Sequence, residues 1–343
     1  MTSPATGPTG SEDEAAVADG ARAGSAWHFG ADSIGLLAAL GVLIVLFGLR
    51  SEHFFTTLTV TMLLNQIPAL TVVTVGMTYV LVVGGIDLSV GSVLAVSGGT
   101  LGVAVAVWGW PLWAAAAASL AIGLLAGALN GAITVAWSLP SFIVTLGTLE
   151  IARGAAYLVT RSQSVYVGAA VEPVGAPIAG LALSPAFIAS VLLVVAGQVV
   201  LARTVLGRYM IAVGTNEEAV RLSGIDPRGV KLTVFAIAGA MAGLGGVFNV
   251  AQLESADPNA GVGMELSAIA AVVIGGTSLM GGRGSVVNSF IGVMIITVLQ
   301  TGLAQIGASE PAKRVITGCV IVLAVIIDGY RHRIGLRARS ARM

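Results

Sequence analysis

Charged side chains are scarce in this sequence. Asp, Glu, Lys and Arg make up only 10% of the 343 residues, whereas soluble domains contain about 25%. The 17 acidic residues balance the 17 basic ones, so the chain has no net charge that would attract nucleic acid. A nucleic-acid partner is therefore not expected, and water is not the main solvent of this protein.

Side chains for metal binding and covalent chemistry are also rare. The one cysteine, Cys319, has no second cysteine with which to form an internal disulfide. His28, His53 and His332 are far apart, so no metal site is predicted. The sequence contains no G-x-x-x-x-G-K-[ST] phosphate-binding loop and no G-x-S-x-G nucleophile motif. We therefore predict that the chain is not an enzyme, and that any ATP it depends on is hydrolysed by another protein.

Long apolar runs fill most of the chain. Hydrophobic residues make up 56% of it, and the mean hydropathy is +0.95. A helix needs about 20 mostly apolar residues to cross a bilayer. We therefore predict an all-α polytopic membrane protein with about ten transmembrane helices. The predicted spans are 34–49, 58–83, 90–109, 112–137, 141–160, 186–202, 232–251, 265–281, 285–303 and 313–329. The eighth and ninth meet in a glycine-rich turn, so one of them could be re-entrant.

The segments outside these spans define the domain organisation. Residues 1–32 are rich in Gly, Pro, Ser and acidic side chains, which predicts a disordered tail. Residues 33–330 form the predicted membrane domain, with its longest inner connection at 203–231, and residues 331–343 form a basic tail. Basic residues gather in the cytoplasmic loops of membrane proteins. With the N-terminus inside, twelve lie on the inner side and four on the outer side, so both termini are predicted to be cytoplasmic.

The inner connection contains an unusually polar stretch, GTNEEAVRLSGIDPRG, at 214–229. Thr215 could cap a short helix there, with Glu218 completing a capping box. Glu217 and Arg221 are one turn apart and could pair. A glycine and an Asp-Pro pair would then end the helix after about two turns. Such a helix either rests on its own protein or inserts into a groove of a cytoplasmic partner.

Four motifs together resemble one family of permeases. They are GGIDLSVGS at 84–92, LPSFIVTLGTLEIARG at 139–154, GRYMIAVGTNEEAVRLSGI at 207–225 and GGTSLMGGRGS at 275–285. In this order the chain is similar to the permease subunit of ribose/xylose-type bacterial ABC importers, over about residues 33–330.

The resemblance implies a bacterial plasma (inner) membrane protein that transports a monosaccharide. It implies a cytoplasmic ATPase subunit that holds ATP and Mg²⁺, an external solute-binding protein, and a second permease copy in a homodimer or heterodimer. It also implies that the polar helix is the coupling helix that contacts the ATPase. The residues carried over to that contact are Glu217, Glu218, Ala219, Arg221, Leu222, Gly224 and Ile225. The outer loops at 161–185 and 252–264 are the expected landing surfaces for the binding protein.

Polar side chains within the spans are candidates for the solute pathway, because such groups usually face the bundle interior or an aqueous cavity. The candidates are Asn65, Gln66, Thr74, Asn130, Glu150, Arg153, Asn249, Asn288 and Gln300. Glu150 and Arg153 are three residues apart, so they could instead form an ion pair that only stabilises one helix. Asn130 is followed by a glycine and could equally be a helix-packing contact.

Residues at the span boundaries are candidates for structural or gating roles. They are Pro68, Gly84, Gly85, Asp87, Gly275 and Gly276. Asp87 could cap the next span, or it could take part in gating. Segments 82–92 and 273–285 resemble each other, which indicates either a duplication or two similar glycine-rich turns.

Other functions are compatible with the same composition. A related permease could import a nucleoside, a branched-chain amino acid or a furanosyl signalling compound. A secondary carrier would transport without an ATPase, and a membrane scaffold would not transport at all.

Overall fold

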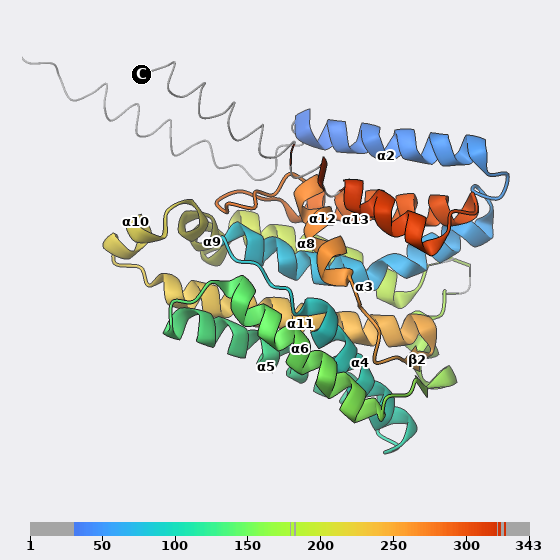
Figure 1. Cartoon of the computed structure of the whole chain (residues 1–343), viewed down its shortest axis with the longest axis horizontal. Helices are drawn as coiled ribbons and strands as arrows, with labels where there is room; N and C mark the ends of the chain where they lie inside the picture. Colours follow the sequence, from blue (N-terminus) through green and yellow to red (C-terminus); the bar gives the residue numbers. More distant parts are fainter. Residues whose placement is uncertain (1–30, 179, 182, 321, 324–325, 327–343) are drawn as a thin grey trace, which may run out of the picture.

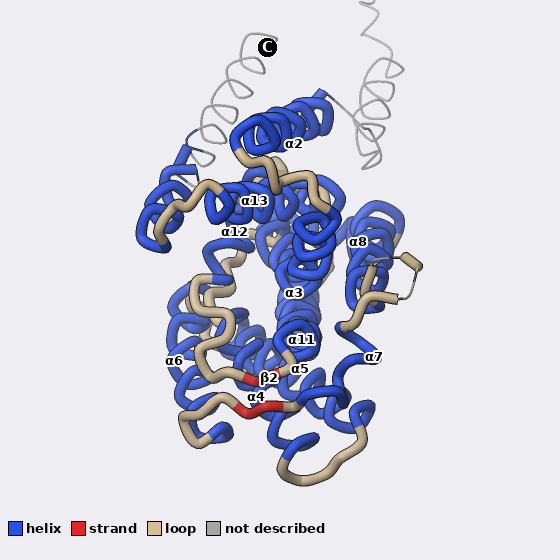
Figure 2. Tube along the Cα trace, turned by 90° about the vertical axis from the view of Figure 1, so that its right-hand side faces the viewer, coloured by secondary structure: helices blue, strands red, loops and turns tan. Residues whose placement is uncertain are grey.

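A computed structural model describes residues 31–178, 180–181, 183–320, 322–323 and 326. The predicted tails at 1–32 and 331–343 lie outside these residues, except that Ala31 and Asp32 begin the first described helix. The structure is a bundle of helices with one short antiparallel ribbon at one end (Figures 1 and 2). The predicted all-α fold is therefore correct in class.

Helices α2 to α6 span Ala31–Arg50, Thr57–Val82, Val90–Ala106, Leu112–Ala136 and Ser141–Thr160. A short connection follows, with β1 at Val165–Tyr166, the 3-10 helix η1 at Gly168–Val171 and α7 at Glu172–Gly175. Helices α8 to α11 span Pro185–Arg203, Val205–Thr215, Glu217–Leu222 and Pro227–Leu253. The last elements are β2 at Ser255–Ala256, α12 at Met264–Ile274 and α13 at Val286–Gln305. Residues 310–320 are also helical.

Seven of the described helices are long and apolar enough to cross a membrane: α2, α3, α5, α6, α8, α11 and α13. This supports a polytopic membrane protein, but it does not confirm ten spans. Helix α4 has 17 residues and α12 has 11. The span predicted at 265–281 is wrong, because α12 ends at Ile274 and Gly276 has a φ of +82° that no helix accommodates. The span predicted at 313–329 lies partly outside the described residues.

Helix α11 occupies the middle of the bundle and contacts α5, α3 and α4 most extensively (Figure 2). Helix α2 lies at the periphery and packs on α13, whereas α5 and α6 lie on the opposite side of the bundle (Figure 1). Helices α3, α11 and α13 are buried over much of their length, which gives the bundle an interior that lipid does not reach.

Small residues bring α5 and α11 together. Gly123 and Gly127 of α5 face Gly239 of α11 so closely that a Cβ at Gly127 would overlap the Phe235 carbonyl oxygen. One helical turn away from this contact, the Ser119 hydroxyl donates a hydrogen bond of 3.0 Å to the α11 backbone. Because lipid tails are as apolar as leucine, close backbone packing and such hydrogen bonds are the main attraction between membrane helices.

The bundle has two distinct ends. At the ribbon end, Val165 of β1 pairs with Ala256 of β2. At the opposite end, which we call the knob end, α10 projects beside α9 (Figure 1). Six basic residues lie at the knob end, on α8 to α11 and on the connection before α13: Arg203, Arg208, Arg221, Arg228, Lys231 and Arg283.

Replacing Gly127 with alanine is expected to destabilise the bundle, because the added methyl group would overlap the α11 backbone. Overpacking of this kind costs about 1–3 kcal/mol. The matched control is Gly41→Ala on α2, where no described atom lies within 4 Å of an added Cβ. Thermal unfolding of the purified variants in detergent measures the difference. Equal melting temperatures for the two variants would show that this contact does not hold the helices together.

Candidate functional site

Helix α10 is a short polar projection, and one side of it packs against the core of the bundle. Val220 is 7% exposed and packs in a cluster with residues of α9 and α11, and Ile225 packs against the same cluster. The apolar side of this helix therefore rests on its own protein, which is the first of the two alternatives given by the sequence analysis. Leu222 is the exception, because 79% of its surface is exposed. Its side chain is therefore accessible to another protein.

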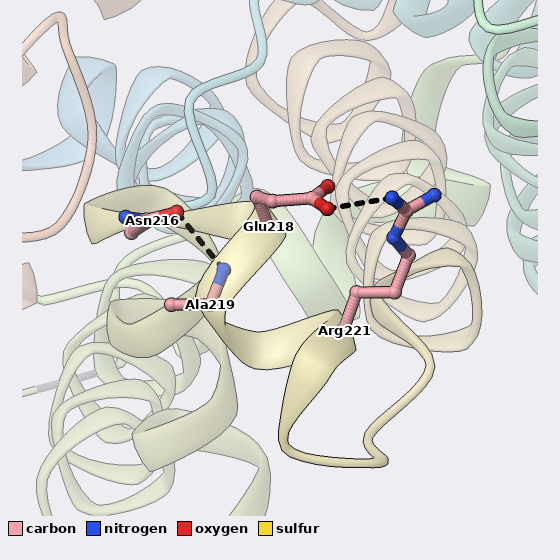
Figure 3. Close-up of polar contacts among 4 residues, drawn as sticks. All are labelled: Asn216, Glu218, Ala219 and Arg221. Carbon is pink, nitrogen blue, oxygen red and sulfur yellow. Dashed lines mark hydrogen bonds and ion pairs between the residues drawn. The ribbon is translucent and has the colours of Figure 1, made fainter.

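The start of α10 differs from the sequence-based prediction. Asn216, and not Thr215, is the N-cap, and its side-chain oxygen accepts a 3.0 Å hydrogen bond from the Ala219 N–H (Figure 3). The predicted capping box is wrong because Thr215 is the last residue of α9, where its hydroxyl donates to the Ile211 carbonyl. The end of the helix agrees with the prediction, since Gly224 has a φ of +82°.

The ion pairs of α10 also differ from the predicted one. Arg221 pairs with Glu218 at 2.6 Å, three residues earlier in the same helix (Figure 3). Glu217 pairs instead with Lys231 of α11, also at 2.6 Å. The predicted pair of Glu217 and Arg221 is therefore wrong, because Lys231 lies close to Glu217 only in the folded chain. The pair with Lys231 links α10 to the central helix, whereas the Glu218 pair stays on the exposed surface.

The segment between α3 and α4 is held by a buried hydrogen-bond network. Asp87 is 1% exposed and accepts hydrogen bonds from the Ser89 N–H at 2.9 Å and the Ser89 hydroxyl at 2.6 Å. The Asn130 amide of α5 donates to the Ser89 hydroxyl, and the Thr148 hydroxyl of α6 donates to Asn130. The predicted capping role of Asp87 is wrong in detail, since Ser89 takes the N-cap position of α4. The network indicates that Asn130 has a packing role.

The two similar glycine-rich segments lie against each other at the knob end. The Gly282 N–H donates to the Val82 carbonyl at 2.9 Å, and Gly84 and Gly281 both have φ values near +80°. A Cβ at Gly275 would come within 2.6 Å of the Ser289 nitrogen of α13. Glycine is therefore required there for close approach. Gly85 packs against Phe235, and Pro68 is buried within α3.

The segment 257–263 enters the bundle and is held there by α6. One guanidinium nitrogen of Arg153 donates to the carbonyl oxygens of Pro258 at 2.6 Å and Ala260 at 2.8 Å. The Tyr157 hydroxyl donates to Asn259 at 2.6 Å. The predicted ion pair of Arg153 with Glu150 does not form among the described residues, since Arg153 instead satisfies backbone carbonyls.

The path of this segment places the start of α12 inside the bundle. Ala256 lies against Gly102 of α4 and Gly261 lies against Gly91 of the same helix. At 1.5 Å per residue these two positions on α4 are about 16 Å apart, which is half the thickness of a bilayer core. The 252–264 loop was expected to lie on the outer surface. That expectation is wrong for its second half, which lies inside the bundle. Helix α12 is a half-length helix that begins near mid-depth.

Two cavities lie on either side of the first half of α3. One, the α3–α7 cavity, has a volume of about 570 Å³ and is lined by Asn65, Gln66 and residues of α7 and the end of α11. The other, the α3–α13 cavity, has a volume of about 610 Å³ and lies between α3, α12, α13 and residues 310–318. Gln66 and Gln300 both line this second cavity. The structure thus brings together two of the predicted pathway residues from distant parts of the sequence.

The remaining pathway candidates are dispersed. Thr74 is buried in α3, and its hydroxyl has no hydrogen-bond partner among the described residues. Asn288 accepts a hydrogen bond from Ser33 of α2 at the knob end. Asn249 is half-buried near the end of α11, and Glu150 is exposed at the middle of α6. None of these four side chains lines either of the two cavities beside α3.

Comparison with known proteins identifies the family. The model of a family described as the permease component of branched-chain amino acid transport systems matches residues 59–325. The chain belongs to this permease family. The ribose import permease of Escherichia coli strain K12 is 39% identical over 309 residues, which cover 86% of this chain and 93% of that protein. The D-allose transport permease of the same strain is 35% identical over 87% of this chain and 91% of that protein.

The fructose import permease of Rhizobium meliloti is 31% identical over 87% of this chain and 85% of that protein. No solved structure matches this permease. Family membership agrees with a transport subunit and not an enzyme.

The hydrogen bonds of Arg153 in this permease could not be predicted from the spacing of nearby residues, because its partners are backbone carbonyls about a hundred residues away. The only hint was an arginine in the middle of an apolar helix, which must find acceptors inside the protein. The cap at Asn216 was recognisable in principle, since asparagine is as good an N-cap as serine or threonine.

Arg153→Leu is expected to loosen the 257–263 segment, because two carbonyl oxygens lose a charged donor. Leaving such groups without partners costs about 1–3 kcal/mol. Hydrogen exchange of a peptide covering 255–263 should therefore become faster in the variant. Glu150→Gln, on the exposed face of the same helix, is the control and should exchange like the parent. Equal exchange in the parent and Arg153→Leu would contradict the clamp.

Proposed function

We propose that this chain is the membrane-spanning subunit of an ATP-driven importer for a monosaccharide. The observation that carries the proposal is that permeases named for ribose, allose and fructose import match it over most of its length. The exposed projection of α10 supports the dependence on a separate motor, because it offers a small polar and apolar surface outside the bundle.

The knob end is the cytoplasmic end in this proposal. Six of the basic residues lie there, on the termini of α8 to α11 and the connection before α13. Cytoplasmic loops are enriched in Lys and Arg, which favours this orientation in a bacterial plasma (inner) membrane. The start of α2 lies at the same end, since Ser33 bonds Asn288, and a cytoplasmic N-terminus is consistent with that position.

The partner at the knob end is a cytoplasmic ATPase subunit, which would hold ATP and Mg²⁺. Helix α10 is its contact, and Glu218, Arg221 and Leu222 are the side chains most exposed for it. Ion pairing of Glu217 with Lys231 would transmit a push on α10 to the central helix α11. Movement of the motor would thereby reach the membrane helices.

A solute-binding protein is the proposed partner at the ribbon end. Glu172 of α7 and Glu254 after α11 are exposed there, and Asp257 is half-buried at the same end. These acidic groups favour a partner with basic residues on its docking edge, since complementary charge orients association.

A second permease copy is the proposed neighbour of α6. Glu150 lies halfway along this helix and is exposed. A carboxylate at that depth is costly in lipid, so an aqueous route or another protein surface has to cover it. Pairing of two copies across such a route would provide that cover.

The main alternative is import of a branched-chain amino acid, which the description of the matching family favours. Uptake into membrane vesicles that contain the permease, its ATPase and its binding protein distinguishes these substrates. We expect ATP-dependent uptake of D-ribose, D-allose or D-fructose and none of leucine. Uptake of leucine instead would show that the substrate is a branched-chain amino acid and not a monosaccharide. Uptake by the permease without the ATPase would show that it is a secondary carrier.

Leu222→Asp is expected to abolish co-purification of the ATPase, because a charge would replace the exposed apolar contact of α10. The matched control is Tyr166→Asp, which removes an apolar side chain of similar exposure at the ribbon end. The control should keep the ATPase bound. If the Leu222→Asp variant retained the ATPase, α10 would not be part of the interface with it.

A further inference from the structure

The α3–α13 cavity is lined by two side-chain amides that have no hydrogen-bond partner among the described residues. They belong to Gln66 of α3 and Gln300 of α13. Both residues lie on helices long enough to cross the membrane. Amide groups in such helices usually face a cavity or a partner, because lipid offers them no hydrogen bonds. A solute that enters the cavity could supply that partner.

The cavity extends from the ribbon end toward the middle of the bundle. Gln66 is nine residues past the start of α3, or about 14 Å along the helix, and Gln300 is five residues before the end of α13, or about 8 Å. Gly263 and Leu266, at the start of the half-length helix α12, line the same cavity. A ligand that bonds both glutamines would thus enter from the ribbon end and come to rest beside α12.

The groups that line the cavity suit a ligand rich in hydroxyl groups. Each glutamine amide both donates and accepts hydrogen bonds, as a hydroxyl does. Thr301 adds a further hydroxyl, and Arg314 adds donors near the opening. The Glu310 carboxylate is paired with Lys313, so it presents no isolated negative charge. The volume of about 610 Å³ is within the range of about 300–1,000 Å³ seen for small-molecule sites.

We propose that the α3–α13 cavity is a binding chamber for a neutral polyhydroxylated solute, with Gln66 and Gln300 bonding its hydroxyl groups. This inference rests on the proposed function and adds a transient binding site for the solute within the permease. Amides bind a sugar less tightly than charged groups would, which suits a site from which the solute must leave.

Protection of an introduced cysteine by sugar tests the chamber. The chain has a single cysteine, so Cys319→Ser gives a background without thiols. Thr301→Cys places a thiol in the cavity of the full-length permease in lipid nanodiscs. We expect a membrane-impermeant thiosulfonate to label it, and D-ribose, D-allose or D-fructose to slow that labelling. Leu192→Cys, on the exposed face of α8, reports labelling from lipid and should react slowly with or without sugar.

Leucine substitutions then identify the binding groups. Gln66→Leu and Gln300→Leu should each raise the sugar concentration for half-protection by roughly 2- to 10-fold, as expected for the loss of a hydrogen bond. Gln252→Leu is the matched control, because Gln252 lines the neighbouring α3–α7 cavity and not this one. It should leave protection unchanged.

Three outcomes would overturn the chamber. Labelling at 301 as slow as at 192 would mean that water does not enter the cavity. Protection weakened by Gln252→Leu and not by Gln300→Leu would place the sugar in the neighbouring cavity. A complex that imports one of the sugars without any protection at 301 would refute the chamber and leave the proposed function intact. Protection without import would support the chamber and count against the proposed function.

Discussion

Close approach of helix backbones at glycine is the contact on which the rest of this structure depends. Helices α5 and α11 touch through Gly123, Gly127 and Gly239 with no side chain between them. In lipid this packing replaces the hydrophobic attraction that holds soluble helices together. It fixes α11 in the centre, so that α3 and α4 pack on its other sides and α10 is carried at its N-terminal end.

Two segments leave the helical conformation inside this frame. Residues 83–89 and 257–263 both expose backbone groups that lipid cannot satisfy, and α6 supplies many of their partners. The Thr145 hydroxyl accepts from the Leu88 N–H, and Arg153 donates to the Pro258 and Ala260 carbonyls. Helix α6 is thus bonded to the interrupted segment before α4 and to the one before α12. A shift of α6 would reach both, which is the kind of link that a transport cycle requires.

The short helix α10 shows how far local rules reach. Its position, its length and its glycine stop followed from the pattern of polar residues and from Gly224. Its cap and its ion pairs did not, because the predicted cap, Thr215, belongs to the end of α9 in the folded chain, and local spacing could not include Lys231 of the next helix. The choice of Asn216 depends on where α9 ends, and that end is set by packing of α9 on the bundle.

The sequence by itself determined that the protein is a helical membrane bundle, where most helices begin and end, and which family it belongs to. Hydropathy and motifs are properties of neighbouring residues, so they can be read without the fold. Tertiary structure alone decided that residues 265–281 hold only a half-length helix, that Arg153 bonds a distant backbone, and that Gln66 and Gln300 line one cavity. These features depend on which helices lie side by side, and that is settled by the packing of small residues across the whole bundle.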